Sequence, residues 1–93
     1  MTGFREKTDR YEELLAEALD DVSVAPPAET PLAAAATDFR TMAASYLEDG
    51  RHFRERGDLP DALAAFSYGH AWLDAGARLG LFDVPTESHL FTV

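Results

Sequence analysis

The chain has 93 residues, which is enough for one small domain and too few for two separate hydrophobic cores. Its hydrophobic content of 46% is typical of a globular protein, and no apolar run approaches the ~20 residues that span a bilayer. A net charge of −9 disfavours nucleic acid and anionic membranes as partners, while the absence of cysteine excludes disulfides and thiolate metal sites and favours a cytoplasmic protein.

The first predicted helix covers about residues 4–22. Apolar side chains recur there every three or four residues, which places them on one face of a helix, while glutamates and aspartates fill the opposite face. A break follows at residues 23–30, because Pro26 and Pro27 cannot donate backbone hydrogen bonds and favour extended geometry.

The second predicted helix, about residues 31–56, is the longest. Thr30 is placed to cap its amino terminus, with Pro31 in the first helical position, and Gly57 is placed to end it. A single apolar stripe runs along this helix. Gly50 falls on the buried side of the stripe, where it either lets a neighbouring helix approach closely or marks a kink.

The third predicted helix covers about residues 59–81 and follows the capping residue Asp58. Its connection to the second helix is so short that the two should form a tight antiparallel hairpin. Residues 83–93 form a tail, with a short extra turn near residues 86–90, that packs on the bundle or on a partner. These elements predict an all-α fold: one domain over residues 1–93, an up-and-down three-helix bundle with an ordered C-terminal tail.

The third helix carries a second apolar face beside its core face. That face combines small residues, which let another backbone approach, with Tyr68 and Trp72, which lie one turn apart and are expected to stack. Two interpretations are open: close packing within the monomer, or an interface with another molecule. The candidate interface residues are Ala65, Tyr68, Gly69, Trp72, Gly76 and, in the tail, Phe91.

A ligand pocket between the second and third helices is the alternative site. His70 and Asp74 lie one turn apart and could form a carboxylate–imidazole pair, while the arginines that end the second helix could bind a phosphate. Against this, His70 could be a core residue bonded to the hydroxyl of Tyr46 or Tyr11, and the arginines could match the helix dipole and nearby acids. The candidate pocket residues are Tyr46, Arg51, Arg54, His70 and Asp74.

No cofactor, metal or catalytic residue is predicted. His52, His70 and His89 have no regular spacing, and no paired-histidine helix motif exists. Phosphate-binding glycine loops are also missing, because the glycines lie inside helices and do not follow a strand.

Several segments carry a resemblance to a known family. They are residues 46–49 (YLED), 61–63 (DAL), 67–75 (SYGHAWLDA), Gly80 and 90–93 (LFTV). In them the chain resembles the archaeal domain of unknown function 357 family, which implies a compact helical bundle of archaeal origin and supplies no activity. The hairpin turn also resembles one tetratricopeptide repeat, but that fold needs stacked repeats. A distant similarity to HEPN ribonucleases fails, because no arginine is followed by histidine at the spacing of their motif.

The acid excess can also be interpreted as an adaptation. The chain has seventeen acidic and eight basic residues, and Lys7 is its only lysine. This composition is typical of halophilic proteins, whose acidic surfaces stay hydrated while salt screens their repulsion. The other explanation is an ordinary acidic protein from a GC-rich genome.

The leading functional expectation is a non-enzymatic interaction module. It would form a homo-oligomer such as a dimer, or bind a protein partner, through the face that holds Tyr68 and Trp72. The second expectation is a small-molecule or nucleotide-binding protein, which could be an enzyme, with its pocket between the second and third helices. A purely structural role is a third option that the sequence does not separate from the first.

Overall fold

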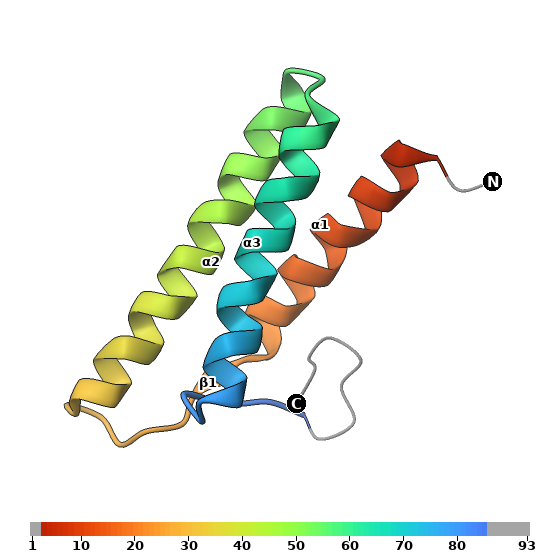
Figure 1. Cartoon of the computed structure of the whole chain (residues 1–93). Helices are drawn as coiled ribbons and strands as arrows, with labels where there is room; N and C mark the ends of the chain where they lie inside the picture. Colours follow the sequence, from red (N-terminus) through yellow and green to blue (C-terminus); the bar gives the residue numbers. More distant parts are fainter. Residues whose placement is uncertain (1–2, 86–93) are drawn as a thin grey trace.

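Three helices form most of the chain between residues 3 and 85, the part that the computed structural model describes (Figure 1). α1 spans Phe4–Asp21, α2 spans Pro31–Glu55 and α3 spans Leu59–Arg78. Two very short strands, β1 at Ser23–Val24 and β2 at Phe82–Asp83, complete the order α1-β1-α2-α3-β2. The prediction of a three-helix, mostly helical domain is therefore confirmed.

Side-chain caps begin α2 and α3 where the sequence predicts them. The Ala33 amide donates a hydrogen bond to Thr30 Oγ1 at 3.2 Å, and Pro31 occupies the first turn. The Asp61 amide donates in the same way to the Asp58 carboxylate at 3.2 Å. Each cap satisfies a backbone donor that the first helical turn leaves unpaired, which fixes where the helix begins.

Glycines in the left-handed conformation end α2 and α3. Gly57 has φ of 77° and ends α2 as predicted. Gly80 has φ of 78°, and the Leu81 amide beyond it donates to the Gly76 carbonyl at 2.8 Å, which closes the last turn of α3. α3 therefore ends at Arg78, before the predicted end at residue 81.

The core lies where the three helices meet, and α2 and α3 make its most extensive contact. Phe66 and Leu73 of α3 and Leu15 of α1 are its largest fully buried apolar side chains. Gly50 of α2 packs on the Phe66 ring, and a Cβ at residue 50 would collide with that ring. Of the two explanations for this glycine, close approach of a neighbouring helix is the one that the contacts support, because α2 is continuous through it.

An antiparallel strand pair, which the sequence analysis does not predict, closes one end of the bundle. β1 pairs with β2 with Val24 opposite Phe82, and the Ala25 amide donates to the Leu81 carbonyl at 2.9 Å. This pairing ties the α1–α2 connection to the segment after α3. It also holds Phe82 against α3, where its ring is buried.

The predicted tail is described only as far as Pro85, just beyond β2. Phe91, His89 and the turn expected near residues 86–90 lie outside the described residues. Within residues 3–85, no helix is both long and apolar enough to cross a bilayer.

Candidate functional site

The hairpin of α2 and α3 has two long flanks, and α1 occupies one of them. In Figure 1, α3 stands between α2 and α1, which agrees with the contacts of α1 being mainly with α3. Arginines of α2 mark the occupied flank. Arg40 donates to the Leu19 carbonyl of α1 at 3.0 Å, and Arg51 and Arg54 bind carboxylates of α1. The opposite flank of the hairpin is therefore the one that α1 leaves uncovered.

Aromatic side chains line this second flank, which we call the aromatic face. They are Phe39, Tyr46 and Phe53 of α2 with Tyr68 and Trp72 of α3. The α2 residues recur every seven positions, close to two helical turns, so they stand in one line. Phe39 and Phe53 directly precede Arg40 and Arg54, so these rings point about 100° away from the arginines that meet α1.

The rings of the aromatic face pair across the two helices. Phe39 and Trp72 meet edge to face, with centroids 5.0 Å apart and ring planes at 87°. Tyr46 and Tyr68 are tilted by 48° with centroids 5.8 Å apart. These pairs across the hairpin take the place of the stacking along α3 that the spacing of Tyr68 and Trp72 predicts. Tyr68 nevertheless stays 62% exposed, while Trp72 is half-buried.

The small residues predicted for the interface are buried within the chain. A Cβ at Gly69 would come within 2.7 Å of the Leu15 side chain and 3.1 Å of the Ala43 carbonyl, so α1 and α2 both pack here. A Cβ at Gly76 would collide with the ring of Phe82. Ala65 is 5% exposed. These positions serve packing inside the monomer, which was one of the two open interpretations, and the exposed part of the candidate interface is Tyr68 with Trp72.

An open depression lies at the hairpin end of the aromatic face. Its lining residues are Tyr46, Asp49, Phe53, Asp61, Ala64, Ala65 and Tyr68. Asp49 comes from α2 and Asp61 from the first turn of α3, and both are exposed. A hydrogen bond and like charge from Asp58 raise the pKa of Asp61 from its ordinary value. The depression thus combines three aromatic rings with two carboxylates.

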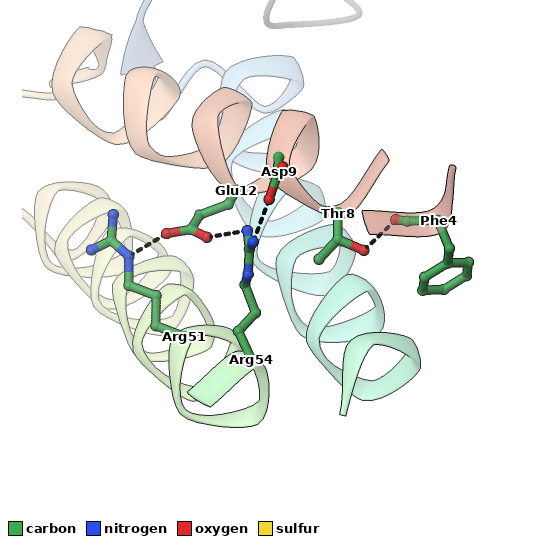
Figure 2. A network of polar contacts seen from close by, with 6 residues as sticks. All are labelled: Phe4, Thr8, Asp9, Glu12, Arg51 and Arg54. Atoms are coloured by element: carbon green, nitrogen blue, oxygen red, sulfur yellow. Dashed lines mark hydrogen bonds and ion pairs between the residues drawn. The ribbon is translucent and has the colours of Figure 1, made fainter. Parts of the chain in front are cut away.

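The two arginines of the predicted ligand pocket bind α1 (Figure 2). Arg54 donates to Glu12 at 2.8 Å and to Asp9, and Arg51 Nε donates to the second oxygen of Glu12 at 2.8 Å. Burial lowers the pKa of Arg54, but the hydrogen bonds and charges of Asp9 and Glu12 outweigh it, and the pKa is raised. Both guanidinium groups therefore bind carboxylates of α1. The sequence pattern indicates acidic partners for these arginines, but it does not point to the acids of α1.

The other predicted pocket residues point to different places. His70 Nε2 lies 3.9 Å from Asp74 Oδ1 across one turn of α3, and both side chains are largely but not fully buried. Tyr46 packs against Tyr68 on the aromatic face instead. The hydroxyl of Ser67 donates to the Leu63 carbonyl at 2.9 Å. The His70–Asp74 pair forms as its spacing predicts, and the structure does not bring it together with Arg51 and Arg54.

Metal ligands do not gather anywhere in the described part of the chain. Within residues 3–85, no group of three or more histidine, aspartate or glutamate side chains could hold a metal ion. His52 lies near Glu48 at 3.9 Å and near Glu55 at 3.8 Å, but all three are exposed and lie along one face of α2.

Two of the five rings of the aromatic face, Phe39 and Phe53, were not predicted as site residues. Both belong to the single apolar stripe of the second helix, and in the structure both are only half-buried at its edge. Their spacing of seven residues from Tyr46 was the available signal, because it aligns all three rings. No binding role was predicted for Asp49 and Asp61, which line one depression only when the hairpin closes.

The fold and this surface define a small acidic protein of the three-helix class with a row of partly exposed aromatic rings. The family model described as "Protein of unknown function (DUF357)" matches residues 10–82, which is more than half of the chain. The chain therefore belongs to this family, and the resemblance found in its sequence is confirmed. No curated protein and no solved structure matches it.

Proposed function

We propose that this protein is a non-enzymatic interaction module that self-associates through its aromatic face, with a second copy of the chain as the partner. The observation that carries the proposal is Tyr68, a large aromatic residue that is 62% exposed within a row of other rings. Tyrosine and tryptophan favour positions where the apolar part of the ring is buried and the polar group contacts water, and they are enriched at interfaces.

Exposed aliphatic side chains extend the same face. Leu32 lies seven residues before Phe39, so it continues the line of rings along α2, and it is 61% exposed. Met42 and Leu79 are also exposed, and helical spacing places them near this flank. A contiguous apolar surface of this kind favours association, because covering it removes apolar area from water.

The size and spacing of the face suit a helical partner of the same kind. Two helices about 10 Å wide and roughly 30 Å long give a flank of about 600 Å², close to the ~800 Å² that each partner buries in a stable interface. Seven-residue repeats of apolar side chains are typical of seams between helices. A twofold pair of hairpins would form a four-helix arrangement.

Charge favours an antiparallel arrangement of the two hairpins. Asp49 and Asp61 lie at the hairpin end of the face, whereas Phe39 and Trp72 lie towards the other end. In an antiparallel pair, the two acidic ends lie at opposite ends of the interface, at its rim, where the carboxylates stay in contact with water. The carboxylates of the two copies then stay apart, which limits the repulsion that a parallel pair would suffer.

Light scattering tests the proposal. At about millimolar protein concentration and high salt, the wild type should scatter with twice its 10.2 kDa mass, and Tyr68→Ala or Trp72→Ala should shift it towards the monomer. Phe4→Ala is the matched control, because Phe4 is an exposed aromatic residue on α1 and lies off the aromatic face. Circular dichroism checks that helicity is retained. A wild type that stays monomeric at both high and low salt contradicts the proposal.

The alternative of a nucleotide-binding pocket has less support. It needs a free guanidinium for a phosphate, and Arg51 and Arg54 are instead bound to carboxylates of α1. Recruiting them would require α1 to give up these ion pairs with α2.

A further inference from the structure

Aromatic rings and carboxylates together line the depression at the hairpin end of the aromatic face. Tyr46 and Tyr68 stand at 48° to each other with centroids 5.8 Å apart, and Phe53 adds a third ring. Asp49 and Asp61 line the same depression from α2 and α3. A purely apolar partner would leave these two carboxylates desolvated and unpaired, which is unfavourable.

Negative charge at this end of the molecule is not neutralised by the described part of the chain. Among residues 3–85, no basic side chain lies within ion-pair distance of Asp49, Asp58 or Asp61, although arginines and histidines contact carboxylates elsewhere. A hydrogen bond with Asp58 and the like charge of Asp58 together raise the pKa of Asp61. A cation placed here would relieve this repulsion.

Aromatic rings beside carboxylates form a surface that selects organic cations. The face of a tyrosine or phenylalanine ring attracts an ammonium or guanidinium group through its quadrupole, and it does so best for weakly hydrated cations. The carboxylates add charge and accept hydrogen bonds from N–H donors. Simple metal ions gain less from the rings, because they are strongly hydrated.

We propose that the depression lined by Tyr46, Phe53 and Tyr68 with Asp49 and Asp61 is a binding site for an organic cation, an alkylammonium or guanidinium group. The rings hold the apolar surface of the cation, and the two carboxylates hold its charge. The group comes either from a free amine such as a polyamine or from a basic side chain. The site goes beyond the proposed self-association, because a cation can bind to it in a monomer.

Arg56 is the basic residue of this chain that could compete for the site. It lies with Asp49 and Phe53 in a neighbouring depression at the end of α2. Its exposed side chain is not ion-paired to any residue between 3 and 85, so it could reach over the carboxylates. If it does, Arg56→Ala should strengthen binding of an added cation.

The three tyrosines provide a direct test by nuclear magnetic resonance of ring-labelled tyrosine. Tetramethylammonium chloride is titrated against sodium chloride at equal ionic strength. We expect saturable shifts at Tyr46 and Tyr68 and none at Tyr11, which lies on α1 with Lys7 and Arg10 already beside its ring. Tyr68→Leu, which removes a ring but keeps an apolar side chain, should weaken binding by about two- to fivefold.

Further ligands and variants separate the possible sources of the cation. Spermidine and N-acetylarginine amide should bind more tightly than tetramethylammonium, and Asp49→Asn with Asp61→Asn should remove that advantage. A tighter spermidine complex identifies a free polyamine as the source, whereas a tighter arginine complex identifies a side chain.

Equal, non-saturable shifts at all three tyrosines, or no shift beyond that of sodium chloride, would overturn the cation site. Light scattering on the same samples reports self-association separately. Absence of cation binding would therefore not contradict the proposed dimer. A monomeric protein that binds cations would contradict the dimer but not the cation site.

Discussion

Two opposing interactions meet at the carboxylate of Asp61. Acidic side chains in the first turn of a helix are stabilised by the positive end of the helix dipole. Asp61 occupies that turn of α3, but Asp58, which caps the helix, lies next to it. The pKa of Asp61 is raised by its hydrogen bond with Asp58 and by their like charges.

Asp61→Asn should therefore stabilise the protein in a pH-dependent way. A carboxyl group whose pKa is higher in the folded state binds protons more tightly there, so its ionisation opposes folding above the raised pKa. At pH 7 the variant should unfold at a higher temperature than the wild type. The difference should vanish below the ordinary carboxyl pKa of about 4, where the wild type is also neutral.

Thermal unfolding followed between pH 3 and pH 7 checks this expectation. Asp38→Asn is the control for the loss of one negative charge, because Asp38 is an exposed aspartate of α2 outside this pair, and Asp61→Asn should stabilise the protein more than it does. An Asp61→Asn variant that is less stable than the wild type at pH 7 would mean that the helix dipole dominates after all.

At the scale of secondary structure, the hydrophobic periodicity and the capping residues were sufficient to predict the three helices. The caps at Thr30 and Asp58 and the stop at Gly57 are local features, so the sequence predicts them directly. The end of α3 was missed because Gly80 lies inside an apolar run that continues the helical pattern. The pair of β1 and β2 was missed because two-residue strands have no periodicity, and their pairing depends on where α3 returns the chain.

The candidate site was predictable only in part for a related reason. The sequence singles out Tyr68 and Trp72, but their partners Tyr46 and Phe39 are set by the register of α2 against α3. That register depends on close approach at Gly50 and Gly69, where an added Cβ would crowd Phe66 of α3 or the Ala43 carbonyl of α2. The residue pattern of a single helix does not determine how that helix aligns with a second one.

Attachment of α1 to α2 depends strongly on Arg54. Its side chain is only 23% exposed and binds both Asp9 and Glu12 (Figure 2). Arg54→Gln should lower the free energy of unfolding by about 1–2 kcal/mol, because two carboxylates lose a charge-assisted partner in a partly buried place. Arg56→Gln, on an exposed residue of the same turn, should change it by less than about 0.5 kcal/mol.

Urea unfolding of the two variants measures this difference. Repeating it in 1 M salt adds a second check, since Arg54 is partly shielded from solvent and its contribution should persist. Equal effects of the two substitutions would show that α1 is held by its apolar contact with α3 alone.

For the whole molecule, the dominant electrostatic term is the repulsion within a chain of net charge −9. Within residues 3–85, three arginine–carboxylate pairs oppose this repulsion, and the pair of the largely exposed Arg51 contributes little. Three histidine–carboxylate contacts are ion pairs only when the histidine is protonated. Salt screens repulsion between exposed acids more than it weakens the partly buried pairs of Arg54. Salt should therefore stabilise the fold, which is also what a halophilic protein requires.

Raising sodium chloride from 0.1 M to 1 M shortens the screening length from about 10 Å to about 3 Å, so most surface repulsion should disappear over this range. We expect the unfolding temperature to rise by about 4–8 °C, which corresponds to about 1 kcal/mol for a domain of this size. Neutralising Glu13, Glu17 and Asp20, which follow one exposed face of α1, should reduce that rise, because like charges three and four residues apart repel along a helix. An unfolding temperature that falls with salt would instead mean that the ion pairs of Arg54 outweigh the repulsion, and that the acid excess is unrelated to salt.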